Sequence, residues 1–345
     1  MDGSFAYRLI GACPSSRKAA RGIDYANMVR AAGEWAERDG WEALLIYTSN
    51  GLADPWAIAQ FLLQSTRTVR PLVAVQPLYE HPFTVANQVL TLTLFYQRQI
   101  WINFVAGDYP HDRAALGDET PHDRRYDRMI EYGGIIRQLH TSPSPVTATG
   151  EFFRVKDLHL FARLPAQLLP EFTVSGSSEA GLNAARALGA CAIQYPKPSH
   201  DYTGSLDPSL RSYGLRIGVI VRSTSEAAWD AAHRRFPENP DGARVRSVAS
   251  QMSDSVWVKE LSKDVAVPAG HPYWLGPYRN YQSSCPFLVG SIDDVARELA
   301  AYLRAGFRTF LLETPSDRGD SEAITGAFRV AQDVAQRALP GTHSR

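Results

Sequence analysis

Short apolar segments alternate along the chain with longer segments in which apolar residues recur every three or four positions. The short segments have the composition of strands buried on both faces, and they cover 6–10, 43–47, 72–75, 100–105, 172–175, 191–195, 217–221 and 310–312. The longer patterns predict helices over 24–39, 54–64, 81–95, 122–139, 178–188 and 292–303. Eight strands that alternate with helices in 345 residues predict an α/β fold, a closed (β/α)8 TIM barrel.

Three segments interrupt this alternation and lengthen the chain beyond a minimal barrel. Residues 106–121 are polar and charged, 142–170 contain the pattern of a hairpin around Gly150, and 237–286 are rich in aromatic residues. Long loops of barrels often belong to the carboxyl ends of the strands, where they cover a ligand. We therefore expect one domain over 1–345, with these three segments as insertions or lid loops.

Composition narrows the classes of partner. The 36 basic residues are balanced by 36 acidic ones, so the chain lacks the broad basic surface that nucleic acid requires, and we expect a small-molecule substrate. The three cysteines and nine histidines show no paired ligand spacing, which predicts neither a disulfide framework nor a metal site. No apolar run approaches the length of about 18 residues that a membrane helix needs. These features predict a cytoplasmic protein with no membrane contact.

The segment 172–180 has the pattern of a strand, a glycine turn and the start of an alanine-rich helix. Gly176, Ser177 and Ser178 form the turn. Unpaired backbone N–H groups and the positive end of the helix dipole suit a phosphate there, and serine hydroxyls add donors. Ordinary N-capping by serine explains the same residues, so both interpretations stay open.

Other polar residues follow predicted strands. Asn103 precedes Ala106 and Gly107, and an asparagine side chain can pair with both a donor and an acceptor, as the pyrimidine edge of a flavin requires. Packing at the rim of the barrel would explain it equally. Tyr47 and Tyr195 end two strands and could supply hydroxyl groups. Among the histidines, His81 at a loop-to-helix junction is the best candidate acid or base.

The order and spacing of four motifs carry a resemblance to a known family. Asn103-Phe104-Val105-Ala106-Gly107, Arg125-Tyr126, Gly150-Glu151-Phe152-Phe153 and Ser175-Gly176-Ser177-Ser178 together resemble the bacterial luciferase-like flavin-dependent monooxygenases. The chain is most similar to the branch that contains the alkanesulfonate monooxygenases, and the resemblance runs from about residue 24 to 334.

The resemblance implies a barrel that binds reduced FMN (FMNH2) delivered by a separate flavin reductase. Reaction with O2, the co-substrate, then gives a C4a-(hydro)peroxyflavin that oxygenates a small organic substrate. The resemblance places the phosphate at Gly176, Ser177, Ser178 and Tyr126, and the isoalloxazine at Asn103, Ala106, Gly107 and Gln76. Together with apolar outer positions on the barrel helices, it predicts a homodimer or homotetramer.

The chain departs from the alkanesulfonate enzymes near the expected substrate. Leu52 replaces a cysteine and Gly218 a histidine, which predicts more room near the flavin and a bulkier or less polar substrate than a simple alkanesulfonate. Arg216 and Arg279 remain at matching positions and could stabilise an anion or bind an acidic substrate, although a surface ion pair would explain Arg279 equally. Two alternatives stay open: a deazaflavin-dependent dehydrogenase or reductase on the same fold, and a flavin-binding homologue without catalysis.

Overall fold

A closed ring of parallel strands forms the centre of the molecule. The computed structural model describes residues 5–19, 21–107, 110–202, 206–253, 255–262, 267–268 and 270–337. The ring contains β1 (Arg8–Ala12), β2 (Ala43–Ile46), β3 (Arg70–Val75), β4 (Trp101–Val105), β7 (Phe172–Ser175), β8 (Cys191–Gln194), β9 (Ser212–Arg222) and β12 (Thr309–Leu312). Strand β9 pairs with both β8 and β12, which closes the ring. The predicted (β/α)8 barrel is confirmed.

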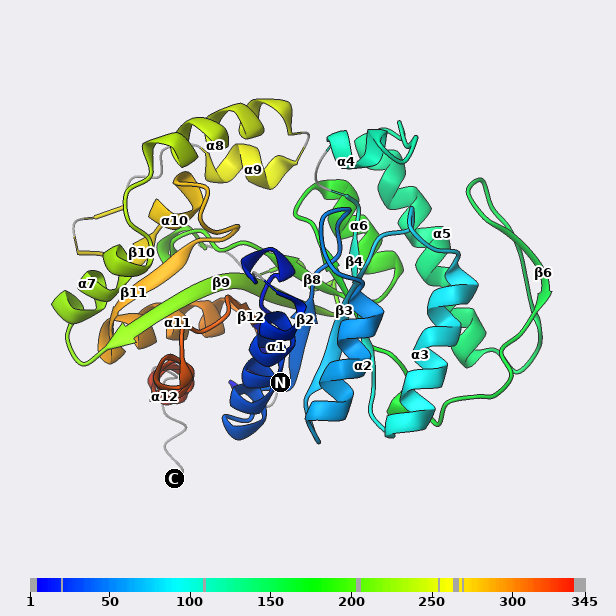
Figure 1. Ribbon diagram of the computed structural model, residues 1–345, viewed down its shortest axis with the longest axis horizontal. Helices are drawn as coiled ribbons and strands as arrows, with labels where there is room; N and C mark the ends of the chain where they lie inside the picture. The colour runs from blue at the N-terminus through cyan, green and yellow to red at the C-terminus, as the bar shows by residue number, and fades with distance from the viewer. Residues whose placement is uncertain are drawn as a thin grey trace, which may run out of the picture.

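Helices surround this ring (Figure 1). They are α1 (Gly22–Arg38), α2 (Pro55–Ser65), α3 (Pro82–Tyr96), α5 (His122–Thr141), α6 (Glu179–Ala187), α11 (Ile292–Ala305) and α12 (Arg318–Arg337). The predicted capping residues begin two of them: the Asp54 carboxylate accepts the Ala57 N–H at 2.8 Å, and the Ser291 hydroxyl accepts the Asp294 N–H at 3.2 Å. The six predicted helices are therefore present, with ends shifted by three residues or fewer.

The barrel has the two hydrophobic regions that its fold requires, and a third cluster packs α7 (Ser225–Arg235) against the carboxyl-terminal part of β9 and against β11 (Phe287–Ser291). The larger one lies between the strands and the surrounding helices. A smaller one fills the interior of the barrel and consists of Ile10, Ala43, Leu45, Leu72, Ala74, Trp101 and Leu311. Because side chains alternate between the two faces of a strand, the next inward position in each strand lies two residues further on, toward the carboxyl end. This register determines which residues can reach a site at that end.

Strand β9 is longer than the sequence predicted. Its residues 212–217 pair with β8 and β12, whereas 218–222 extend beyond the barrel and pair with β11 (Phe287–Ser291). The predicted strand, 217–221, contained little of the barrel-closing part because Gly214 interrupts the apolar pattern. Glycine is required there, since a Cβ atom would lie 2.9 Å from the Thr309 carbonyl oxygen. In Figure 1, β9 is the long strand that runs from the barrel to β11 and α7 (Ser225–Arg235).

The position of Gly218 corrects one expectation. A Cβ atom at this residue would lie 2.3 Å from the ring of Phe287, so the space that glycine leaves is filled by an aromatic side chain. Gly218 does not enlarge the room near a ligand. Leu52 does line a cavity, as described below.

The three predicted insertions lie in different places. Residues 106–121 contain α4 (Pro110–Ala114), and 142–170 contain the predicted hairpin, β5 (Val146–Thr149) and β6 (Arg154–Leu158), which are antiparallel. The hairpin packs along α5 at the right edge of Figure 1. Residues 237–286 contain α8 (Pro240–Met252), α9 (Val256–Leu261), β10 (Tyr273–Trp274) and α10 (Gly276–Arg279).

Within the described residues, no helix combines the length and apolar character needed to cross a lipid bilayer. Cys13, Cys191 and Cys285 are all free thiols.

Candidate active site

Two connected cavities open at the carboxyl ends of the barrel strands. The deeper one, which we call the barrel cavity, has a volume of about 370 Å³ and is lined by side chains from all eight strands of the ring or the residues that follow them. The second, the outer cavity, has a volume of about 860 Å³ and extends from the barrel rim to α8 and α9. Both are lined by Ser15, Arg17, Val105, Ser175, Tyr195, Gln282, Ser283 and Ser284. The two cavities therefore form one continuous space.

The barrel cavity has a polar layer directly above the apolar interior of the barrel. The next inward position of a strand lies two residues after its last apolar inward residue. This rule leads from Leu45 to Tyr47, from Ala74 to Gln76, from Trp101 to Asn103 and from Leu311 to Glu313. Arg216 adds a cation from β9, and Leu52 adds an apolar surface. The alternation of the strands thus places amide, phenol, guanidinium and carboxylate groups in one buried ring.

The amide side of this ring is held by short contacts. Asn103 Oδ1 accepts hydrogen bonds from the hydroxyls of Thr173 at 2.7 Å and Ser175 at 3.0 Å, which leaves its Nδ2 donors available to a ligand. Gly107 has a φ of 89°, and a Cβ atom there would lie 2.9 Å from Gln76 Nε2. The Gln76 amide therefore packs directly against the Gly107 backbone. Ala106 is buried behind this layer and lines neither cavity.

The glycine-serine turn after β7 lies on the wall of the outer cavity together with Tyr126 of α5. Ser178 is the N-cap of α6, and its hydroxyl oxygen accepts the Gly181 N–H at 3.1 Å, so the capping interpretation holds for this residue. The Ser177 hydroxyl is buried and has no hydrogen-bond partner. A buried hydroxyl without a partner costs free energy. Its position beside a helix N-terminus therefore suits an anionic ligand such as a phosphate.

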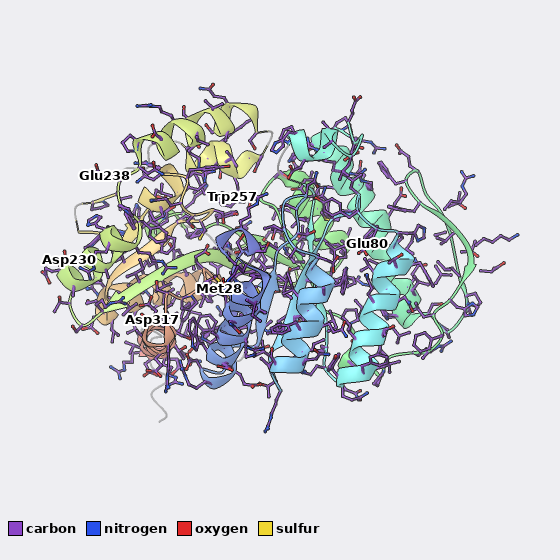
Figure 2. The ribbon with its side chains drawn as sticks, in the orientation of Figure 1. Met28, Glu80, Asp230, Glu238, Trp257 and Asp317 are labelled. Atoms are coloured by element: carbon purple, nitrogen blue, oxygen red, sulfur yellow. The ribbon has the colours of Figure 1, made fainter. Side chains whose placement is uncertain are left out.

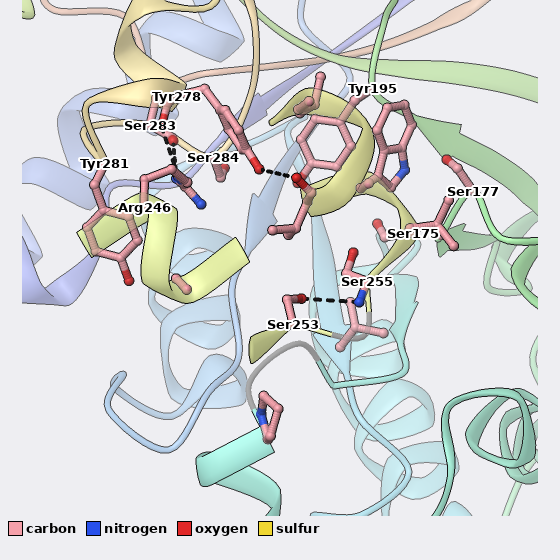
Figure 3. A pocket seen from close by; sticks show the side chains of 18 of the residues that line it. Ser175, Ser177, Tyr195, Arg246, Ser253, Ser255, Tyr278, Tyr281, Ser283 and Ser284 are labelled. Carbon is pink, nitrogen blue, oxygen red and sulfur yellow. Dashed lines mark hydrogen bonds between the residues drawn. The ribbon is translucent and has the colours of Figure 1, made fainter. Parts of the chain in front are cut away.

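The approach of the turn to Tyr126 requires glycine. A Cβ atom at Gly176 would lie 2.6 Å from the Tyr126 hydroxyl. The turn, the tyrosine and the start of α6 thus form one crevice, and a flavin phosphate fits the donors present there. Ser175 and Ser177 lie on the same side of the cavity in Figure 3.

Arg216 is the charged centre of the barrel cavity. Its Nη2 atom donates to Glu313 Oε2 at 3.0 Å and to the Tyr47 hydroxyl, and its Nη1 atom donates to the Leu312 carbonyl at 3.5 Å. Burial, the largest single cause, lowers the pKa of Arg216, but Tyr47, Glu313, Cys285 and Tyr195 together outweigh it and the pKa is raised. Burial also raises the pKa of Tyr47. The pair is therefore a permanent cation beside a neutral phenol.

Two predicted catalytic residues, like the predicted cofactor residue Ala106, lie outside the cavities. His81 is an exposed N-cap residue of α3, where Nδ1 accepts the Phe83 N–H at 3.2 Å and the ring packs against Phe153 of the hairpin. Arg279 is exposed at the end of α10 and lines neither cavity. Tyr195 does line both cavities, and its ring packs edge-on against Trp257 at 4.8 Å between centroids.

Sequence reasoning missed three residues that line the cavities. Glu313 carried a usable signal, because it lies two positions after an inward-facing leucine of the last strand. Arg113 is on α4 and donates to the Gly107 carbonyl at 3.0 Å, and Arg246 is on α8. Neither arginine belongs to the alternating pattern of a strand. Trp257, which the sequence showed only as one of several aromatics, lies on α9 facing the barrel in Figure 2.

A (β/α)8 barrel with a crevice of hydroxyl and backbone N–H donors at a helix start, beside a buried polar cavity, suits an enzyme that binds a phosphorylated cofactor. The sequence matches the luciferase-like monooxygenase family over residues 9–309, and the chain belongs to that family. By family it is thus classed with the luciferase-like monooxygenases. The resemblance to the luciferase-like superfamily is thereby confirmed, whereas the assignment to the alkanesulfonate branch stays a prediction.

Relatives with known activities differ in chemistry. The 4-(gamma-L-glutamylamino)butanoyl-[BtrI acyl-carrier protein] monooxygenase BtrO of Niallia circulans is 29% identical over 275 residues, which are 78% of this chain and 80% of that one. An F420-dependent secondary alcohol dehydrogenase in complex with an F420-acetone adduct has a TM-score of 0.64 at 17% identity, over 94% of this chain and 99% of that chain. The oxygenating constituent of 3,6-diketocamphane monooxygenase from Pseudomonas putida, in complex with FMN, has a TM-score of 0.63 at 15% identity, over 97% and 99%. At these identities the two structures show a shared fold alone.

Proposed function

We propose that this chain is the oxygenase component of a two-component system that uses reduced FMN and O2 to oxygenate a small organic substrate. The carrying observation is the buried, unpartnered Ser177 hydroxyl in a glycine turn at the start of α6, beside a cavity lined by all eight strands. When bound, the flavin supplies the reducing electrons and the activation of oxygen. The protein's residues bind and orient it.

The described residues divide this work between two ends of the site. Ser177, Ser178 and the Gly176 backbone would hold the phosphate, with the Tyr126 hydroxyl beside them. Asn103 and Gln76 would meet the ring, because both present amide groups in the barrel cavity. The apolar interior below this layer would help to keep water away from a ring bound there.

Arg216 supplies the electrostatic part of the mechanism. Arg216 is 4% exposed and its guanidinium is fixed by Glu313 and Tyr47, so it needs no reorganisation when negative charge develops in the barrel cavity. Preorganised charge of this kind is effective where water is excluded. The neutral Tyr47 phenol can donate or accept a hydrogen bond at the same point.

The outer cavity is the proposed substrate site. Its wall from α8 and α9 is largely apolar and includes Val256, Trp257 and Leu261. Leu52 lines the barrel cavity where the alkanesulfonate enzymes have a cysteine, which supports an organic substrate other than a simple alkanesulfonate. The relative BtrO acts, by its name, on an acyl group attached to a carrier protein. The exposed rim residues Val245 and Val248 would admit such a tethered chain, and we include carrier-bound substrates in the proposal.

A separate flavin reductase would supply the reduced FMN. The resemblance to two-component monooxygenases supports delivery by a partner. A small-molecule substrate and a reductase are thus the two proposed partners.

The F420-dependent dehydrogenase of the same fold keeps one alternative open, namely hydride transfer by a deazaflavin. Anaerobic titration of the protein with reduced FMN and with reduced F420, followed by an oxygen pulse in stopped-flow spectroscopy, separates the two. We expect binding of reduced FMN and flavin-dependent oxygen consumption. Binding of reduced F420 alone would favour the dehydrogenase, and binding of neither would refute a flavin function.

A further inference from the structure

The outer cavity has an unusual balance of charge for a chain of zero net charge. Its lining contains no Asp or Glu among the described residues, but it contains Arg17, Arg244, Arg246, His111 and His122. Three of these five contact a neighbouring carboxylate: Arg244 contacts Asp241, His111 contacts Asp112, and His122 contacts Asp123. Arg17 and Arg246 have no carboxylate partner among the described residues.

Arg246 is held in one orientation by four contacts. Its guanidinium lies 4.0 Å from the centre of the Tyr278 ring and 4.7 Å from that of Tyr281. Nε donates to the Tyr278 carbonyl at 2.9 Å, and Nη2 donates to the Ser283 carbonyl at 3.1 Å. Figure 3 shows the side chain beside these residues on the cavity wall. The two carbonyls use two of the five guanidinium donors, and the Tyr278 phenol is a further side-chain hydrogen-bond partner, which leaves donors for a ligand in the cavity.

Arg246 lies near the point where the two cavities meet. The Ser283 carbonyl that it contacts belongs to a residue that lines both of them. The Ser283 hydroxyl lies 3.5 Å from Glu313 Oε2, which in turn contacts Arg216. A ligand group held by Arg246 would therefore lie at the entrance to the barrel cavity, with the rest of the ligand able to extend toward either side.

We propose that Arg246 binds a carboxylate group of the substrate and that the enzyme selects organic molecules that carry one. A fixed guanidinium presents parallel donors that match a carboxylate, and stacking on two rings removes part of its water before the ligand arrives. The rest of the substrate would contact the apolar wall formed by Val256, Trp257 and Leu261. This inference rests on the proposed function, because it assigns the substrate to the outer cavity. It also replaces Arg279, the arginine expected from the sequence, by one on a different helix.

The test compares two probes of nearly the same shape, the anion octanoate and the neutral octanamide. Each is titrated into the full chain with and without saturating FMN and followed by saturation-transfer NMR. We expect the wild-type protein to bind octanoate about tenfold more tightly, the effect of one charge-assisted contact at a half-exposed site. Arg246→Gln should remove this preference and leave octanamide binding unchanged. Arg246→Lys, which keeps the charge but not the planar fork, should retain part of it.

Arg234→Gln is the matched control, because Arg234 is exposed on α7, lines neither cavity, and its loss changes the net charge equally. Octanoate preference should persist in this variant. An equal loss of both probes in Arg246→Gln would mean that Arg246 only holds α8 in place, and a preference that survives in Arg246→Gln would assign the anion to another residue. Either result overturns the proposal. A loss of reduced-FMN affinity in Arg246→Gln would also overturn it, whereas failure of the wild-type protein to bind reduced FMN would refute the proposed function instead.

Discussion

Replacing Ser177 by alanine should change flavin binding and protein stability in opposite directions. In the ligand-free protein the hydroxyl is buried without a partner, so it contributes a desolvation cost and no hydrogen bond. Removing it should leave the free energy of unfolding unchanged or raise it by up to about 1 kcal/mol. In the complex the same hydroxyl would donate to a phosphate oxygen. Loss of one charge-assisted hydrogen bond costs about 1.5–3 kcal/mol, which corresponds to a dissociation constant about ten to a hundred times larger.

The neighbouring Ser178 provides the contrast. Its hydroxyl caps α6 by accepting the Gly181 N–H at 3.1 Å, so Ser178→Ala should lower the free energy of unfolding by about 0.5–2 kcal/mol. If its O–H also donates to the phosphate, flavin affinity should fall as well. The two adjacent serines should therefore affect stability with different signs, although both weaken binding.

The measurements are anaerobic fluorescence titration with reduced FMN and urea unfolding of the ligand-free protein. Reduced-FMN affinity that is unchanged in Ser177→Ala would refute the phosphate assignment. A clear loss of stability in Ser177→Ala would show instead that the hydroxyl has a structural partner, which would remove the observation on which the proposed function depends.

Three further predictions follow from single contacts. Gly176→Ala should weaken flavin binding, because the new Cβ atom would lie 2.6 Å from the Tyr126 hydroxyl, and titration should show that Tyr126→Phe in the same chain restores part of the affinity. Glu313→Gln leaves the buried Arg216 cation without its carboxylate, so it should lower the free energy of unfolding, measured by urea denaturation, by about 3–5 kcal/mol. A loss no larger than that of an exposed ion pair would contradict the interpretation as a buried ion pair. Burial lowers the pKa of His140 to about 4. Below about pH 6.5 the unfolded chain therefore binds a proton that the folded protein excludes, and stability falls from there to about pH 4. His140→Leu should flatten this part of the unfolding profile, and an unchanged slope would mean that other groups cause it.

The strand alternation made a large part of the site predictable. Tyr47 and Asn103 were selected because they end predicted strands and Gln76 through the resemblance, and all three line the barrel cavity, two positions after an inward apolar residue. The same rule applied to Leu311 would have found Glu313. The glycine turn at 176–178 was recognisable as a turn before a helix, but its local pattern fits N-capping as well as phosphate binding, and Ser178 is indeed the N-cap of α6.

The register of β9 was harder to predict. Gly214 breaks the apolar pattern, although the approach of Thr309 and Ile193 requires glycine at that position. The interpretation of Gly218 as open space was wrong for a related reason. A glycine in a strand indicates that another group packs closely against the backbone, and only the fold shows that this group is the Phe287 ring rather than a ligand. Long-range packing determines both outcomes, and no local pattern contains it.

The arginines of the segment 237–286 show where sequence reasoning ends. Arg246 and Arg279 both lie on short helices near aromatic residues, and motif matching favoured Arg279. Which of them faces the cavity depends on how α8 and α10 pack against each other, and the Gly242 backbone fits beneath the Asn280 carbonyl so closely that a Cβ atom would lie 2.2 Å from it. That contact brings Arg246 toward Tyr278 and Ser283 and leaves Arg279 at the surface. If this packing determines substrate choice, then Gly242→Ala should displace α8 and reduce the preference for octanoate over octanamide, although residue 242 would not contact the ligand. Its effect should disappear in the Arg246→Gln background, and independent effects of the two substitutions would refute the connection.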